Sequence, residues 1–222
     1  GDVYKRQGVD GPPAMGAAIT RGKSMAKVCV MFGFFRRKRA PKLEAQWLVV
    51  GLGNPGAKYA ATRHNVGYMA LDELAGELTP VPGVKALVQV RDGVAYARST
   101  TYMNTTGEAV GPLAQALGVA PERIIVVHDE LDLPAGKVRV KLGGNENGHN
   151  GLKSITEHLG TRDYLRVRMG IGRPPQGVAV PDWVLSPIDG DISDQVSLAA
   201  KAVQVIVSEG LSKAQNVIHA TR

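Results

Sequence analysis

The chain has 222 residues, 44% of them hydrophobic and 21% charged, a balance that is typical of globular domains and excludes disorder over the whole length. Its single cysteine, Cys29, excludes a disulfide framework and a cysteine-rich zinc site. The net charge of +7 suggests nucleic-acid binding, but ten of the 27 basic and three of the 20 acidic residues lie within residues 1–46. Residues 47–222 hold 17 of each, so the overall charge does not indicate RNA binding.

Residues 1–46 lack sustained periodicity, and we predict that this basic segment is a disordered or non-native tail. Its apolar run at residues 28–35 is too short to span a bilayer, and four basic residues follow it, whereas a signal peptide carries its charge in front. Two alternatives stay open: a basic arm that follows nucleic-acid phosphates, and a weak surface anchor built on the phenylalanines of that run. We expect a cytoplasmic protein with no membrane partner.

From Trp47 onward the sequence alternates between strand and helix patterns, in one domain over residues 47–222. Short apolar or alternating runs predict strands at residues 47–50, 84–90, 94–97, 124–127, 138–140 and 165–171. Apolar residues at helical spacing predict helices at residues 64–78, 105–117, 152–159 and 193–209. Thr105 and Glu108 predict a capping box for the second helix, and Gly210 predicts the end of the last. The alternation predicts a single-domain α/β sandwich.

The segment from Gly51 to Gly56 matches the glycine spacing of a dinucleotide-binding loop directly after a strand. However, Pro55 lacks the N–H that a phosphate cradle uses, no helix pattern follows at once, and no acidic residue ends a second strand. We therefore interpret the segment as a tight turn that presents Asn54 at the carboxyl end of a strand, where α/β proteins place their sites. A nicotinamide or flavin cofactor is not expected.

His64 opens a predicted helix, and Asp129 follows the clearest predicted central strand. A carboxylate at the end of a buried strand that accepts from an imidazole N–H is the arrangement that orients a general base. The alternatives are a capping histidine and a turn-capping aspartate. Metal binding by His128, Asp129, Glu130 and Asp132 is disfavoured, because neighbouring strand residues point to opposite faces and no H-E-x-x-H motif is present. We therefore expect no metal. The sequence contains no G-x-S-x-G elbow, so a serine nucleophile is not indicated.

Asparagines recur at the predicted junctions between elements, at Asn54, Asn65, Asn104, Asn145, Asn147 and Asn150. Each has an ordinary alternative role as a turn residue or helix cap. Several amides that converge on one pocket would instead hold a substrate that itself carries amide groups.

Taken together and in this order, six sequence blocks resemble the bacterial peptidyl-tRNA hydrolase family, over about residues 48–219. The blocks are Gly51–Gly56 with Tyr59, Thr62–Gly67, Thr101–Asn104, His128–Pro134, Gly148–Ser154 and Gly170–Pro174. The resemblance implies a single α/β domain, a three-layer sandwich in which helices enclose a twisted mixed sheet. It also implies hydrolysis of the ester between a peptide and the 3′ ribose of tRNA, without cofactor or metal.

The resemblance assigns roles to particular residues of this sequence. It implies that His64 is the general base, that Asp129 accepts from the other imidazole nitrogen, and that Asn54 belongs to the catalytic set. Asn54, Asn104 and Asn150 are implied to hold the peptide and ester carbonyls, with at least one amide donor near the developing oxyanion. It also implies that five residues line the cleft and bind the substrate, namely Tyr59, Met103, Asn104, His149 and Asn150.

Local charge provides an RNA-binding surface in the otherwise neutral domain. Three acidic and seven basic residues lie between positions 137 and 168, the basic ones being Lys137, Arg139, Lys141, Lys153, Arg162, Arg166 and Arg168. The resemblance implies that Lys141 and Arg168 clamp the 5′-phosphate of tRNA, and a solvated basic face is the alternative for the other five. Peptidyl-tRNA is thus the expected partner, and a monomer the expected state.

The sequence departs from the family pattern in three places. Asn145-Glu146-Asn147 replaces a glycine-rich run with a histidine, Ser99-Thr100 replaces a proline, and residues 76–98 form a shorter stretch than usual. Glu146 thereby adds a negative charge beside a phosphate-binding loop. A non-catalytic RNA-binding paralogue on the same fold is the alternative function, but the retained base, carboxylate and asparagines favour an enzyme.

Overall fold

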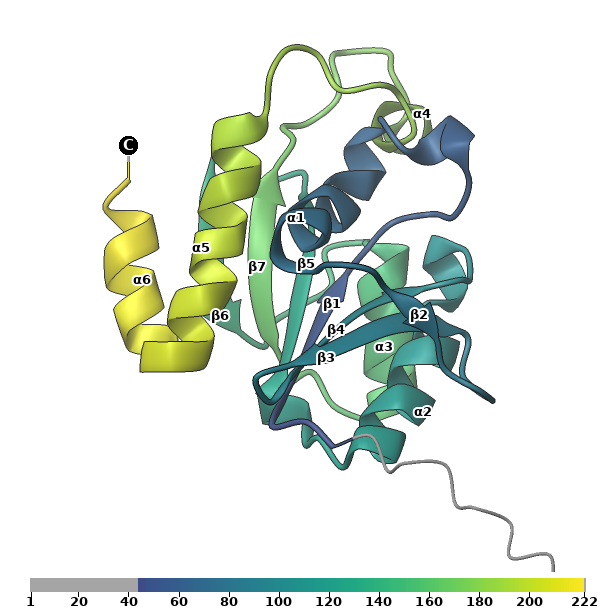
Figure 1. Ribbon diagram of the computed structural model, residues 1–222. Coiled ribbons are helices and arrows are strands. Elements are labelled where there is room, and N and C mark those ends of the chain that lie inside the picture. The colour runs from purple at the N-terminus through teal and green to yellow at the C-terminus, as the bar shows by residue number, and fades with distance from the viewer. Residues whose placement is uncertain (1–43, 222) are drawn as a thin grey trace, which may run out of the picture. The chain divides into compact units, whose positions relative to one another are not determined.

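A mixed seven-stranded sheet organises the residues that the computed structural model describes, 44–221 (Figure 1). Its strands are β1 (Trp47–Gly51), β2 (Thr79–Pro80), β3 (Ala86–Arg91), β4 (Val94–Ser99), β5 (Ile124–Glu130), β6 (Val138–Leu142) and β7 (Leu165–Gly170). Their spatial order is β2-β3-β4-β1-β5-β7-β6, with β1 parallel to both β4 and β5, and β5 parallel to β7. The tail predicted at residues 1–46 lies almost wholly outside the described residues.

Helices cover both faces of this sheet. They are α1 (Val66–Leu74), α2 (Gly107–Leu117), α3 (Asn150–Leu159), α4 (Val180–Val184), α5 (Ser193–Glu209) and α6 (Leu211–His219). Alternate residues of the central strands pack to opposite sides, as the period of two requires. Val49 and Val127 join the core with α1, α5 and α6, whereas Leu48 and Val126 join the core with α2 and α3. The predicted three-layer α/β sandwich is therefore confirmed.

The observed strands and helices agree with those predicted from the sequence, except at the ends of some elements and in short segments. All six predicted strands and four predicted helices are present, but the first helix is shorter than predicted at both ends: a 3-10 turn (Arg63–Asn65) precedes it, and it ends at Leu74. The predicted capping box is wrong. The 3-10 turn Met103–Thr105 runs directly into α2, so no extended N-cap residue exists, and Glu108 instead pairs with Lys85.

Gly210 ends α5 with a φ of 86°, as predicted, but α6 resumes at the next residue and was not predicted. The side chain of His219 on α6 accepts from the backbone N–H of Val140 (3.0 Å), so this helix covers the edge strand β6. No helix in the described part of the chain is long and apolar enough to cross a membrane.

A close approach between α1 and the sheet is made possible by glycine. A Cβ atom on Gly67 would lie 2.3 Å from the carbonyl oxygen of Val127 and 2.6 Å from the amide nitrogen of Leu52. Only glycine therefore fits at this position without a backbone shift. The contact brings the residues that precede α1, including His64, to the carboxyl ends of β1 and β5.

Candidate active site

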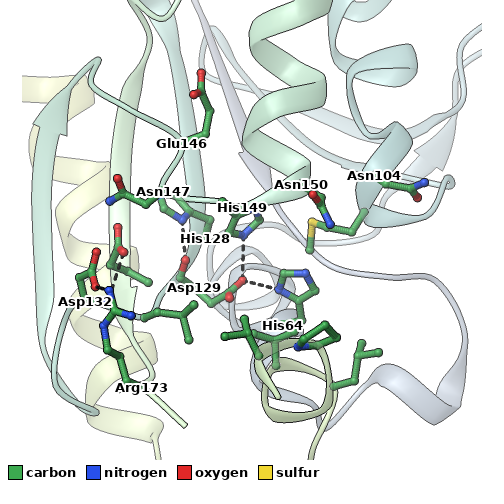
Figure 2. A pocket seen from close by; sticks show the side chains of 18 of the residues that line it. His64, Asn104, His128, Asp129, Asp132, Glu146, Asn147, His149, Asn150 and Arg173 are labelled. Carbon is green, nitrogen blue, oxygen red and sulfur yellow. Dashed lines mark hydrogen bonds and ion pairs between the residues drawn. The ribbon is translucent and has the colours of Figure 1, made fainter. Parts of the chain in front are cut away.

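A cavity of about 600 Å³ opens at the carboxyl ends of β1 and β5, and His64 and Asp129 both line it (Figure 2). His64 Nδ1 lies 2.8 Å from Asp129 Oδ1. Because a carboxylate only accepts hydrogen bonds, Nδ1 carries the proton, and the lone pair of Nε2 is left free. The structure thus joins the two residues in the geometry that was predicted for a base and its orienting carboxylate.

His149 provides a second donor to the same carboxylate oxygen. Its Nε2 lies 3.0 Å from Asp129 Oδ1, while its Nδ1 accepts from the backbone N–H groups of Gly151 (3.2 Å) and Leu152 (3.4 Å) at the start of α3. Both ring nitrogens are therefore engaged within the protein, with Nδ1 as acceptor and Nε2 as donor. The structure places His149 in the cavity, as predicted, but its contacts orient Asp129 and cap a helix.

The electrostatics of this cluster keep Asp129 ionised. Its carboxylate is fully buried, which opposes charge, but His149 and His64 together outweigh the burial and hold the pKa of Asp129 well below its usual range. His128 lies next to it, with Nδ1 2.6 Å from the backbone oxygen of Asp129. Burial and the neighbouring His149 lower the pKa of His128 well below its ordinary value, so this imidazole is neutral.

Asn54 is held by the backbone N–H of Met103 and by the side-chain amide of Asn65. Its Oδ1 accepts from the N–H of Met103 (2.8 Å), and its own N–H donates to Asn65 Oδ1 (2.9 Å), while Asn65 Nδ2 donates to the oxygen of Asn54 (3.0 Å). Since Oδ1 is used, the Nδ2 group of Asn54 is the part available to a ligand. Among the described residues it has no partner, so an amide donor is preset on the cavity wall.

Three further predicted residues line this cavity: Met103, Asn104 and Asn150. Both asparagines are exposed, whereas Met103 is buried. Tyr59 is not among the lining residues, and its ring packs edge-on against exposed Tyr102 at 6.3 Å between centroids, so its contact with the substrate stays a prediction.

One wall of the cavity was not predicted from the sequence. The segment around α4 contributes apolar side chains, including Val180, Val184 and Leu185. This segment is attached to Arg63, the residue before His64. Arg63 is buried, hydrogen-bonds Ser186, Pro187 and Asp189, and lies 3.7 Å from the centre of the Trp183 ring. No pattern in the sequence distinguishes this buried arginine from a surface one.

Lys141 and Arg168 lie on adjacent strands, where β6 pairs with β7 in antiparallel register. Arg168 Nε donates to Glu130 Oε2 (2.9 Å), which leaves the two terminal nitrogens of the guanidinium for a ligand. Burial, followed by Arg168 and Arg166, lowers the pKa of Lys141. The two predicted phosphate ligands thus form a site with unbalanced positive charge.

Other members of the predicted basic band have internal partners. Arg166 is buried and donates to the backbone oxygens of Gly144 (2.6 Å) and Asn145 (2.7 Å), so it supports the loop before α3 and does not face solvent. Arg162 pairs with Glu146 through two hydrogen bonds, of 2.7 and 3.3 Å. This hydrogen bonding lowers the pKa of Glu146 to about 2, and the expected excess negative charge is compensated.

The cluster of His64, Asp129 and His149 also has the donor types of a metal site, with ligand atoms within 4.8 Å of one another. The two imidazole nitrogens, His64 Nδ1 and His149 Nε2, meet one oxygen of Asp129 at 2.8 and 3.0 Å, which are the distances of direct hydrogen bonds.

The fold and this site define an α/β protein in which a carboxylate orients a histidine at the wall of a cavity. In the part of the chain that the structure describes, no serine, threonine or cysteine lines the cavity as a nucleophile. The peptidyl-tRNA hydrolase family profile matches residues 48–222.

The chain is 64% identical to peptidyl-tRNA hydrolase 2 of Corynebacterium glutamicum, across 81% of this chain and 92% of that protein. It is 47% identical to the peptidyl-tRNA hydrolase of Cutibacterium acnes, across 78% and 98%. The crystal structure of peptidyl-tRNA hydrolase from Acinetobacter baumannii is similar with a TM-score of 0.72 and 34% identity, across 80% of this chain and 96% of that one. The chain belongs to the peptidyl-tRNA hydrolase family and is an enzyme.

Proposed function

We propose that His64 is the general base with which this enzyme hydrolyses the ester between a peptide and the 3′ ribose of tRNA. The observation that carries the proposal is the 2.8 Å contact between His64 Nδ1 and Asp129 Oδ1 at the cavity wall, which leaves Nε2 free to take a proton. Nε2 removes a proton from water as the water oxygen attacks the ester carbonyl. Asp129 stabilises the imidazolium that forms, and such a positioned base contributes about 10²–10⁴-fold to the rate.

Asn54 acts on the carbonyl oxygen. Its Nδ2 group donates to the oxyanion of the tetrahedral intermediate, and because Met103 fixes the amide beforehand, no reorganisation is needed. The imidazolium of His64 then returns its proton to the departing 3′ oxygen of the ribose. An ester has a good leaving group, so these steps need neither a covalent nucleophile nor a metal. Asn104 and Asn150 hold the peptide amides.

The same proposal includes the RNA partner. Lys141 and Arg168 bind the 5′-phosphate of tRNA, and the charge that Glu130 leaves uncompensated supports this assignment. Removal of the 5′-phosphate from the substrate should raise KM, and the same treatment should have little effect on an Arg168→Gln variant. We also propose that the enzyme acts as a monomer in the cytoplasm.

The deciding experiment is incubation with N-acetyl-aminoacyl-tRNA, with and without EDTA, alongside His64→Ala. We expect release of the acylated amino acid that survives EDTA and a loss of at least about 10²-fold in the variant. Tight tRNA binding without release at high protein concentration would favour the alternative, a non-catalytic RNA-binding protein. Loss of activity in EDTA, restored by a divalent metal, would refute the metal-free mechanism.

A further inference from the structure

A second cavity, of about 370 Å³, lies beside the first, and Asn54 lines both. Apolar side chains of Met69 and Leu87 contribute to it, together with the small side chains of Ala57 and Ala60. Apart from Asn54, it contains none of the residues assigned above to the reaction or to the phosphate clamp.

The charge of the second cavity is balanced. Its one cation, Arg98, is paired with Asp72 (3.3 Å) and lies 5.4 Å from the ring centre of Tyr68. The polar side chains of Asn65, Tyr68 and Ser99 also line it, but each is hydrogen-bonded within the protein. With these groups and the charges satisfied, and apolar side chains in the wall, the cavity suits a neutral, apolar group. At about 370 Å³ it has room for one side chain of the size of leucine or phenylalanine.

The order of strands places the two cavities and the phosphate clamp in sequence across the sheet. Lys141 and Arg168 lie on β6 and β7, Asp129 on β5 and Asn54 directly after β1, whereas the second cavity includes residues of β4 and β3. Figure 2 shows the same direction at the first cavity, with Asp132 and Asn104 on opposite sides of the pair formed by His64 and Asp129.

This order fixes the direction of the substrate. If the RNA is held at β6 and β7 and the ester lies at His64, the peptide must extend over β1 toward β4 and β3. Side chains of successive residues in an extended peptide point to opposite sides, so the last two residues of the peptide need different pockets. Asn54, locked by Asn65 and Met103, is the fixed partition between them.

We propose that the second cavity binds the side chain of the peptide residue that precedes the esterified one, and that it selects an apolar side chain. This inference rests on the proposed function, because it takes the ester to lie at His64. It makes the enzyme selective for the penultimate residue of the peptide, which the catalytic groups alone would not discriminate.

The test compares three substrates that share the same esterified alanine: N-acetyl-Ala-tRNA, N-acetyl-Gly-Ala-tRNA and N-acetyl-Leu-Ala-tRNA. We expect kcat/KM for the leucine substrate to exceed that for the glycine substrate by about ten-fold, since filling an apolar pocket discriminates by roughly 10–200-fold. An aspartate at the same position should give no gain. Equal values for leucine and glycine in the unaltered enzyme would overturn the inference.

Variants of the enzyme test whether the preference for leucine arises in the second cavity. Ala60 is exposed at the cavity, so Ala60→Trp fills the space without disturbing the core, and the ratio between the leucine and glycine substrates should fall to about two-fold or less. Ala116→Trp, at an exposed position on α2 that lines neither cavity, is the matched control and should keep the ratio. A preference that persists in Ala60→Trp would place the subsite elsewhere and overturn the inference.

The one-residue substrate separates this inference from the proposed function. Cleavage of N-acetyl-Ala-tRNA together with equal cleavage of the two longer substrates refutes only the second cavity. Absence of cleavage of all three substrates refutes the proposed function itself.

Discussion

Replacement of His149 tests whether this residue positions the Asp129 carboxylate or binds the substrate. Its two nitrogens have separate tasks: Nε2 donates to Asp129, and Nδ1 accepts from the first N–H groups of α3. Asparagine is a favoured N-cap residue but is too short to replace the imidazole at Asp129. His149→Asn should therefore remove the first task and retain the second, whereas His149→Ala removes both.

The expected magnitude follows from the contact. A hydrogen bond to a charged group contributes about 1.5–3 kcal/mol, and each 1.4 kcal/mol corresponds to ten-fold in rate. If Asp129 loses this donor, it remains ionised near neutral pH but is held by His64 alone. We therefore expect kcat to fall by about 10- to 100-fold in both variants with little change in KM. His149→Ala should lose about 1 kcal/mol more stability through the missing cap.

The assay is steady-state hydrolysis of N-acetyl-aminoacyl-tRNA, combined with urea unfolding of each variant. His158→Asn is the matched control, because His158 lies exposed on the same helix and lines neither cavity. A rise in KM with an unchanged kcat in His149→Asn would show that His149 binds substrate directly. That result would refute the positioning role.

Three further predictions concern the surroundings of the site. His128 is buried and its pKa is lowered, so the unfolded chain binds more protons below pH 6.5; stability measured by urea unfolding should fall by about 1 kcal/mol from pH 7 to 5.5, and by less in His128→Gln. Gly67→Ala forces a Cβ into the sheet backbone; thermal unfolding should show a loss of about 1–3 kcal/mol, and kcat should fall because His64 lies in the 3-10 turn directly before α1. Glu146→Gln releases Arg162; tRNA affinity should rise about two-fold at low salt and be unchanged at high salt.

The fold could be predicted from periodicity because most elements bury a continuous apolar surface. The strand at residues 124–130 is buried at every position, and such runs have few alternative interpretations. The missed helix α4 has only five residues, which is too short for a helical period to appear. The wrong capping box shows the limit of local motifs: Thr105 and Glu108 have the right spacing, but the preceding 3-10 turn changes the conformation in which they would act.

The charge of the chain illustrates a different limit. Counting residues between 137 and 168 gives a basic band, yet burial decides which of those charges can reach a phosphate. Arg166 and Arg168 lie two residues apart on β7. The guanidinium of Arg166 is occupied by hydrogen bonds to loop oxygens, whereas only one nitrogen of the Arg168 guanidinium has a partner. A count of charges cannot separate the two arginines, because both are strand residues in the same kind of sequence.

The deeper reason that the site could be predicted only in part is the role of the backbone. His64, Asp129 and Asn54 have side chains whose chemistry is visible in the sequence, so their types and order indicate a base, a carboxylate and an amide donor. The groups that orient these side chains belong largely to the backbone. The N–H of Met103 fixes Asn54, and N–H groups of α3 fix His149, which in turn contacts Asp129. Nearly every residue has an N–H group, so these partners leave no mark in the sequence. The fold alone brings these partners to the active site, and mutations that move α3 or the 3-10 turn before α2 should therefore impair catalysis without touching a catalytic side chain.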